Sequence, residues 1–226
     1  VSGSGSITKV GNGILTLSGT NSYSGDTTIS AGTLLVTSQL GGGSYAGDIS
    51  NAGDLGINSS NNQTLSGVIV VSGTINKSGS GELTLTGANT FDGTINIAGG
   101  TLFAGGSSDS SNKITEGNII VKGGTLSGSG IIDGNVTFSS TAGTLAPGNS
   151  IGTLTINDNL TLSTDDTTNI EFNSTTADKI VINGNTVLAG TISLYPEDTT
   201  YSDVTHTIVD ASGGGTFNGT FSTETM

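Results

Sequence analysis

A long segment of this chain occurs twice without gaps. Lys9–Val36 returns as Lys77–Ala104, so the two copies are offset by 68 residues. Both copies carry the pattern Lys-x-Gly-x-Gly-x-Leu-Thr-Leu-x-Gly-x-Asn and end near Gly-Thr-Leu. Internal repetition on this scale is typical of solenoids, in which each segment packs mainly on its neighbours. The repeat therefore predicts an elongated, stacked structure.

Short runs that alternate apolar and polar residues recur along the whole chain. Such alternation over three to five residues predicts strands with one buried face. Pairs such as Gly-Asn, Gly-Gly and Asn-Gly separate the runs and tolerate the positive φ of tight corners. Pro147 and Pro196 lie between predicted strands, where a missing amide donor costs little. The predicted strands are 14–17, 33–36, 54–57, 67–71, 82–85, 94–97, 118–121, 135–138, 153–156, 159–162, 170–172, 179–182 and 191–194.

Two all-β architectures could hold these strands. An antiparallel sandwich would require longer strands joined by hairpins. A parallel β-helix uses very short strands, with glycine- and asparagine-rich corners and one turn every ~18–25 residues, so the repeat offset equals about three turns. We predict the β-helix, all-β and right-handed as parallel crossovers almost always are. It would have roughly nine to eleven turns and a length of ~45–55 Å.

Composition limits the possible partners. Five Lys plus Arg stand against eighteen Asp plus Glu, which gives a net charge of −13. A polyanion needs clustered cations, so nucleic acid and anionic lipid surfaces are poor partners, and we expect no nucleic-acid binding. Cysteine is absent, which excludes disulfides, thiolate metal sites and cysteine catalysis. No apolar run approaches the ~20 residues of a membrane span, and we expect no membrane insertion of this fragment.

The sequence offers little evidence for a catalytic site. His206 is the single histidine, and no G-x-S-x-G elbow accompanies it, so we interpret it as a strand or loop residue near the C-terminal end. Carboxylates gather loosely at Asp165, Asp166, Glu171 and Asp178. Paired carboxylates serve glycoside hydrolysis at a defined separation. The sequence favours a solvated turn between Leu162 and Ile170, and an intrinsic polysaccharide-active enzyme is the weakest hypothesis.

Other ligand motifs are also missing. Neither the glycine-rich calcium nonapeptide nor an EF-hand loop occurs. Leu40–Gly43 lacks the Lys-Ser/Thr of a phosphate loop and is predicted to be a plain loop. Ser107–Asn112 is predicted to be a polar loop that breaks the turn pattern, either a binding protrusion or, as we favour, a plain insertion. The sequence thus assigns no catalytic, cofactor-binding or metal-binding residue, and predicts that the chain is not an enzyme.

The motifs resemble those of a known family. The Lys9–Val36 unit and its copy resemble the passenger-associated repeat of bacterial autotransporters of type V secretion. In the C-terminal half, 143–156 resembles the PGNSIGTLT motif of such passengers, and 177–184 resembles their D-x-L-x-V-x-G strand. The segment 207–215, followed by 219–221, resembles the region shortly before the membrane barrel.

The resemblance implies an architecture and a location. It implies a surface-exposed β-helix, carried to the bacterial outer membrane by a C-terminal translocator barrel that is absent from this chain, and either attached there or secreted. We expect one β-helix unit over 1–226, with repeat-bearing turns in 1–140 and membrane-proximal turns in 141–226.

The expected function follows from the outer surface. Stacked Thr, Ser and Asn would form ladders of hydroxyls and amides, through which two rods could associate by many weak hydrogen bonds. We therefore expect adhesion or autoaggregation, as in biofilm or virulence adhesins, or a stem that displays an adhesin. The partners would be passengers on neighbouring cells or a host-cell or matrix surface. The alternative is a non-catalytic scaffold for a secreted enzyme whose catalytic domain lies upstream.

Overall fold

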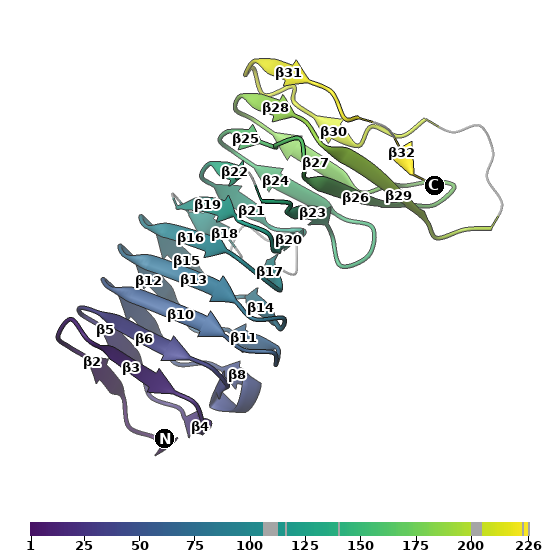
Figure 1. Cartoon of the computed structure of the whole chain (residues 1–226). Coiled ribbons are helices and arrows are strands. Elements are labelled where there is room, and N and C mark those ends of the chain that lie inside the picture. The colour runs from purple at the N-terminus through teal and green to yellow at the C-terminus, as the bar shows by residue number, and fades with distance from the viewer. Residues whose placement is uncertain (106–112, 116, 140, 200–204, 223, 226) are drawn as a thin grey trace.

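Short parallel strands line the sides of a continuous coil. The computed structural model describes residues 1–226 except 106–112, 116, 140, 200–204, 223 and 226. Strand pairing between successive turns is parallel throughout the named strands of this part of the chain. The chain rises as an elongated right-handed coil, with the strands of one sheet stacked like steps (Figure 1). The predicted β-helix is confirmed, with about nine turns.

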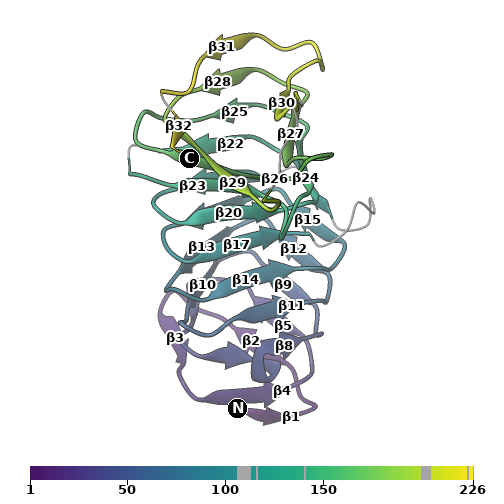
Figure 2. The ribbon, with the colours of Figure 1, turned by 90° about the vertical axis from the view of Figure 1, so that its right-hand side faces the viewer.

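Three long sheets and one short sheet form the sides of the coil. Sheet 1 contains β3 (Ile14–Leu17), β6 (Thr33–Val36), β10 (Asp54–Asn58), β13 (Thr74–Ser78), β16 (Thr94–Ile97), β19 (Asn118–Val121), β22 (Val136–Phe138), β25 (Leu160–Thr161), β28 (Thr186–Leu188) and β31 (Phe217–Gly219). Sheet 2, which faces the viewer in Figure 2, contains β8 (Ser44–Tyr45), β11 (Gln63–Leu65), β14 (Glu82–Leu85), β17 (Thr101–Ala104), β20 (Thr125–Gly128), β23 (Thr144–Pro147), β26 (Thr167–Phe172), β29 (Thr191–Pro196) and β32 (Glu224–Thr225).

Sheet 3 closes the cross-section. It contains β2 (Ile7–Lys9), β5 (Thr27–Ile29), β9 (Ile49–Asn51), β12 (Ile69–Val71), β15 (Asn89–Phe91), β18 (Lys113–Thr115), β21 (Ile131–Asp133), β24 (Thr153–Ile156), β27 (Lys179–Ile182) and β30 (Val209–Asp210). The short N-terminal sheet contains β1 (Ser2–Gly3), β4 (Thr20–Tyr23) and β7 (Gln39–Leu40), and a single 3₁₀ turn, η1 (Gly41–Gly43), follows β7.

Aliphatic side chains stack inside the coil because the register repeats in every turn. In sheet 1, for example, Leu34, Leu55, Ile75 and Ile95 are successive register partners, and each is fully buried. Alternate residues point outward, which matches the period-two pattern of the sequence. Each predicted strand overlaps an observed one. The strands that the alternation missed include β9 and β11, which bury Asn and Gln, and also the more apolar β17 and β21.

The corner before sheet 1 requires glycine in several turns. Gly53, Gly73 and Gly93 follow one another there, and a Cβ on Gly73 would collide with the carbonyl oxygen of Gly53. Backbones at this corner therefore approach more closely than a side chain permits. This explains why glycine precedes so many of the sheet 1 strands.

The two copies of the repeat lie on different faces. The first copy begins in β2 of sheet 3 and continues through β3 of sheet 1, whereas the second begins in β13 of sheet 1 and continues through β14 of sheet 2. The offset of 68 residues therefore equals three turns and one further face, rather than a whole number of turns. The repeat therefore specifies strands and corners, and it begins on two different faces of the coil.

Both prolines differ from the prediction that places them between strands. Pro147 is the last residue of β23 and Pro196 is the last residue of β29. A proline can end a strand because its missing amide hydrogen is lost only at the terminus of the ladder. Gly148 follows Pro147 with a φ of 83°, so the bend expected at this corner begins directly after the strand.

Candidate interaction surfaces

Two lysines of the repeat are buried at equivalent positions. Lys9 and Lys77 are 6% and 1% exposed. Lys77 Nζ donates to the backbone carbonyl oxygens of Ser78 at 3.1 Å, Gly79 at 2.9 Å and Gly99 at 3.0 Å. Burial lowers the pKa of the Lys77 ammonium, because a charged form loses solvation there. Each lysine is thus a structural donor to corner carbonyls.

Lys9 repeats the arrangement on the neighbouring face. Its Nζ donates to the carbonyl oxygens of Val10, Gly11 and Ala31 at 3.0, 2.6 and 3.0 Å. These two lysines open the two copies of the repeat, and no role was predicted for them. The signal available was their identical place in both copies, in a chain that contains only five cations.

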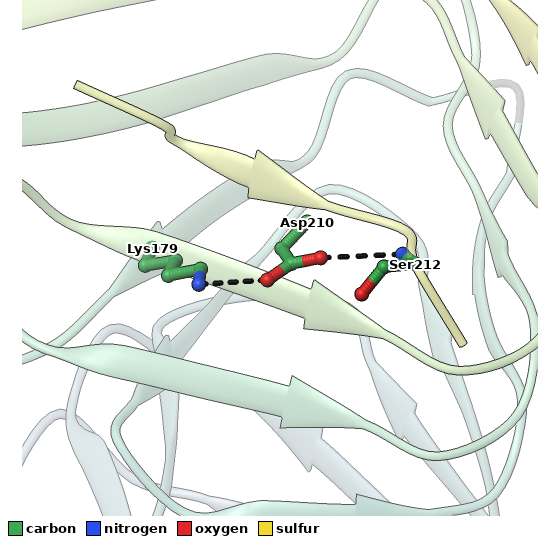
Figure 3. Close-up of polar contacts among 3 residues, drawn as sticks. All are labelled: Lys179, Asp210 and Ser212. Carbon is green, nitrogen blue, oxygen red and sulfur yellow. Dashed lines mark hydrogen bonds and ion pairs between the residues drawn. The ribbon is translucent and has the colours of Figure 1, made fainter. Parts of the chain in front are cut away.

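The burial of these lysines makes the outer surface more anionic than the composition suggests. Lys179 is engaged by Asp210, with Nζ 2.8 Å from Oδ2. Asp210 also accepts a hydrogen bond from the Ser212 amide at 3.2 Å (Figure 3). The hydrogen bond from Lys179, followed by those from Ser212, lowers the pKa of Asp210 to about 2. The contact joins β30 to β27 near the C-terminal end.

Side-chain amides form a ladder at the corner before sheet 1 in the C-terminal half. Asn135 Nδ2 donates to Asn118 Oδ1 at 2.9 Å, and Asn159 Nδ2 donates to Asn135 Oδ1 at 2.6 Å. Asn159 Oδ1 in turn accepts the backbone amide of Asn185 at 2.7 Å. We call this set the asparagine ladder; its members are Asn118, Asn135, Asn159, Asn185 and Thr216.

A second, shorter ladder runs beside the first at the end of sheet 3. Asn183 Nδ2 donates to Asn157 Oδ1 at 2.7 Å, and Asn157 Nδ2 donates to Asp133 Oδ1. The corners between sheets 3 and 1 thus carry the pattern Asp/Asn-x-Asn, a signal that the sequence analysis did not use. The expected polar ladders exist, and at these corners their hydrogen bonds are made largely within the chain.

Threonines form an outward column on sheet 2. Successive register partners place five threonines in line, and all are partly exposed. We call them the threonine column: Thr101, Thr125, Thr144, Thr167 and Thr191. This column presents hydroxyl groups on a regular surface of the kind predicted from the sequence.

Sheet 2 opens into a cleft where β23 and β26 part. Their pairing stops at Leu145 and Thr168, while β26 continues beside β29 as far as Phe172. Figure 1 shows β26 and β29 extending together past the neighbouring strands. The cleft has a volume of about 400 Å³. It is lined by Ser127, Ala146, Pro147, Gly148, Asn149, Asn169, Glu171, Asp178 and Tyr195.

Asp178 fastens the loops beside this cleft. It is 1% exposed, and its Oδ1 accepts the Gly152 amide at 2.8 Å while its Oδ2 accepts the Glu171 amide at 2.7 Å. Burial raises the pKa of Asp178 to about 6, the two amide donors oppose this, and the charges of Glu171 and Glu197 add to the rise. Asp178 therefore positions the loop after Pro147.

Asp166 serves a different corner. It is 2% exposed, and it accepts the amides of Gly143 at 2.9 Å and Ser163 at 2.6 Å, as well as the Ser163 hydroxyl at 2.8 Å. The prediction of a solvated turn is wrong for Asp166, because its carboxylate satisfies buried turn amides, but fits the exposed Asp165. Glu171 and Asp178 line one cleft, and Asp166 does not.

His206 lies in a loop before β30, as predicted. Its Nε2 is 3.1 Å from the carbonyl oxygen of Asn173, and its ring centroid is 6.5 Å from that of Phe172. The histidine borders a small apolar cavity of about 200 Å³ beneath β26 and β29. No hydrogen bond from a serine or aspartate reaches its ring among the contacts of the described residues.

The remaining segments considered as ligand sites are the glycine loop at Leu40–Gly43 and the polar segment Ser107–Asn112. Leu40 ends β7 and η1 forms a tight turn, with Gly42 at a φ of 66°, so the loop predicted over Leu40–Gly43 contains a 3₁₀ turn. The segment Ser107–Asn112 lies outside the described residues. Within the described ranges, no three His, Cys, Asp or Glu side chains gather as metal ligands. Over the same ranges, no helix has the length and apolar character to cross a membrane.

Comparison with known proteins locates the repeat independently. The family model described as Passenger-associated-transport-repeat matches residues 7–36 and 75–102. An adhesin autotransporter, BmaC, from Brucella suis biovar 1 (strain 1330) is 42% identical over 62 residues. That match covers 27% of this chain and 2% of the length of BmaC. No solved structure matches the chain.

The matched residues coincide with the two copies found by internal comparison. They fall on β2 to β6 and on β13 to β17, the strands that hold the buried lysines. The motifs in 143–221 lie outside the family match, so their resemblance remains a prediction. The chain carries two passenger-associated-transport-repeats within one β-solenoid, and this confirms its likeness to an autotransporter passenger domain.

Proposed function

We propose that this chain is a surface-exposed passenger segment that acts in adhesion or autoaggregation, or as the stem that displays an adhesin. The observation that carries the proposal is the threonine column on sheet 2, a regular row of partly exposed hydroxyl positions on a rod whose cations are largely buried or paired. The relative named as an adhesin supports it. We further propose that the chain has no catalytic role and is located on the bacterial cell surface.

Such a surface favours many weak contacts. A hydrogen bond between two protein surfaces contributes about 0.5–1.5 kcal/mol net, so one hydroxyl pair holds nothing by itself. A row of five positions on each rod, multiplied over many rods between two cells, provides multivalency. Neighbouring passengers are the partner that presents a matching row.

Cell display tests this proposal directly. Bacteria that display the chain should clump and settle, and the purified chain should self-associate at high concentration. Changing Thr125 and Thr144 to Glu adds repulsion to the threonine column without touching the core, and should reduce clumping. The control changes Thr28 and Thr90, which point outward on sheet 3, to Glu, and should leave clumping unchanged.

Two outcomes would overturn the adhesive proposal. One is a strictly monomeric chain combined with cells that neither clump nor adhere to host surfaces. The other is equal loss of clumping in both charge variants, which would indicate a general charge effect. The stem alternative then remains, and is tested by deleting the chain from between an upstream domain and the cell surface.

A further inference from the structure

An acceptor atom in the wall of the sheet 2 cleft lacks a partner. Asn169 Oδ1 is buried and receives no hydrogen bond from the described residues. Buried polar atoms are satisfied in the great majority of proteins, by the chain itself or by a bound molecule. Asn169 lines the cleft beyond the point where β23 and β26 part, and its other neighbour, β29, pairs with it through Ser193 without supplying a donor to Oδ1. A ligand donor that reaches this wall of the cleft would satisfy the atom.

The walls of the cleft are held in place before any ligand enters. Asp178 holds the loop after Pro147 through Gly152, and it holds β26 through Glu171. Ser150 Oγ also donates to Glu197 Oε1 at 3.3 Å, which joins that loop to the end of β29. A site fixed in this way loses little conformational freedom on binding.

The lining combines an aromatic ring with oxygen acceptors. Tyr195 is 50% exposed, and its register partner on β26 is Glu171. Asn149 and Asn169 add amide groups, and no lysine or arginine is among the lining residues. A partly exposed aromatic ring can pack on the C–H face of a sugar ring. Carboxylate and amide oxygens accept hydrogen bonds from the hydroxyl groups of the sugar. The lack of a cation disfavours acidic sugars and phosphates.

We propose that this cleft binds a neutral saccharide unit of a surface glycan. Its volume of about 400 Å³ fits one or two sugar rings and lies in the range of small-molecule sites. Tyr195 stacks on the ring, and Asn169 Oδ1 and Glu171 accept hydroxyl groups. The inference rests on the proposed adhesive function for its biological role, and names the class of ligand that the rod recognises.

Titration of the isolated chain with neutral oligosaccharides tests the proposal. We would add cellotriose, chitotriose and lactose to ¹⁵N-labelled protein at millimolar concentrations. At least one sugar should shift the amide signals of 148–149 and 169–171 in a saturable way. Tyr195→Ala should weaken that binding by about tenfold or more, which corresponds to the loss of about 1.4 kcal/mol.

A matched variant separates a specific site from a general surface effect. Phe217 on β31 is 52% exposed and belongs to sheet 1, so Phe217→Ala removes an equally exposed aromatic ring elsewhere. It should leave sugar binding unchanged. Asn169→Ala should weaken binding several-fold, because it removes the unpartnered acceptor. Both side chains lie outside the buried core, so the fold should persist and can be checked from the rest of the spectrum.

Three results would overturn the saccharide site. They are the absence of saturable shifts with every neutral sugar, equal weakening by Tyr195→Ala and Phe217→Ala, and tighter binding of spermidine that Glu171→Gln abolishes. The last result would identify an amine site instead. Because these measurements use the isolated chain, their failure leaves the cell-clumping test unaffected, and clumping can fail while sugar binding remains.

Discussion

In the two halves of the coil, buried side chains of opposite charge form hydrogen bonds with the backbone groups at the corners. In the N-terminal half (2–104), buried Lys9 and Lys77 donate to backbone carbonyl oxygens. In the C-terminal half (113–222), buried Asp166 and Asp178 accept backbone amides. A buried charge is tolerated only when hydrogen bonds replace its lost hydration. Both halves therefore use ionic groups for the same structural task, the pairing of corner backbone groups.

The halves also differ in the regularity of their turns. The Asn76–Asn96 pair of the N-terminal half is 20 residues apart, whereas the steps of the asparagine ladder and its Thr216 end are 17, 24, 26 and 31 residues. Regular turns leave almost no chain outside the coil. Longer turns provide the loops that flank β23, β26 and β29, and these loops wall the cleft on sheet 2. The regular turns of the N-terminal half therefore form a uniform rod, whereas the longer turns of the C-terminal half form the cleft.

Removal of a repeat lysine should have the largest effect. Lys77→Met retains the apolar stem but leaves the carbonyl oxygens of Ser78, Gly79 and Gly99 without their donor. We expect a loss of about 2–4 kcal/mol in the free energy of unfolding, because each buried unpaired group costs about 1–3 kcal/mol. Urea denaturation followed by circular dichroism would measure it.

The exposed Lys122 provides the control for this variant. Lys122→Met makes the same chemical change on the surface and should shift the midpoint little. Equal urea midpoints for the two variants would show that the hydrogen bonds from Lys77 to the three carbonyl oxygens do not stabilise the fold. That result would remove the basis for the first half of the comparison.

Interruption of the asparagine ladder should have the next largest effect. Asn159→Ala removes the donor to Asn135 Oδ1 and the acceptor of the Asn185 amide. We expect a loss of about 1–2 kcal/mol, since each hydrogen bond contributes about 1 kcal/mol net. Asn76→Ala, which removes only one exposed partner of Asn96, should cost less. An equal cost for both variants would contradict a special role for the corner ladder.

Much of the architecture was predictable from the sequence because the repeat and the alternation both reflect stacking. Some strands that bury aliphatic residues, such as β6 and β16, were predicted with their observed bounds, whereas β17 and β21 were missed although they also bury aliphatic residues. Strands that bury amides, such as β9 and β11, were missed because Asn and Gln are ordinarily surface residues. Their burial depends on partners in the next turn: Asn51 Nδ2 donates to the Thr74 carbonyl, 23 residues away.

The candidate site was less predictable. Local patterns reveal neither the parting of β23 and β26 nor the burial of Asp166 and Asp178, because both depend on residues a full turn apart. These carboxylates lie close together in the sequence, but in the fold Asp166 and Asp178 lie at different corners. The face on which each repeat copy lies was also not predicted, because it depends on the turn length: with turns of 20 residues, as between Asn76 and Asn96, the offset of 68 residues exceeds three turns by one face.

The role of the buried aspartates in the C-terminal half can be tested through the pH dependence of the free energy of unfolding. The pKa of Asp178 is about 6 in the folded chain, against an ordinary value of 3.8. The folded state therefore binds this proton more readily than the unfolded state, and the free energy of unfolding should fall by about 1 kcal/mol from pH 5 to pH 7. Asp178→Asn should abolish this contribution, as measured by urea midpoints at both pH values. Asp165→Asn, at an exposed carboxylate away from this cleft, should retain it.

The smallest effect should come from the ion pair between β27 and β30. Lys179 and Asp210 have side chains that are 34% and 29% exposed, so water and salt screen their attraction. Asp210→Asn keeps an acceptor for the Ser212 amide and removes only the charge. We expect amide hydrogen exchange in β30 to rise a few-fold while exchange in β24 and the urea midpoint stay unchanged.

The pH dependence of this contact has the opposite sign to that of Asp178. Lys179 and Ser212 hold the pKa of Asp210 near 2, so the contact is fully present above pH 3.8 and is lost as the pH falls toward 2. Lys179→Met should raise β30 exchange as much as Asp210→Asn does, and the double variant should add nothing further. Additive effects would show that the two side chains act separately. The pairing of β30 with β27 would then depend on the backbone ladder rather than on this ion pair.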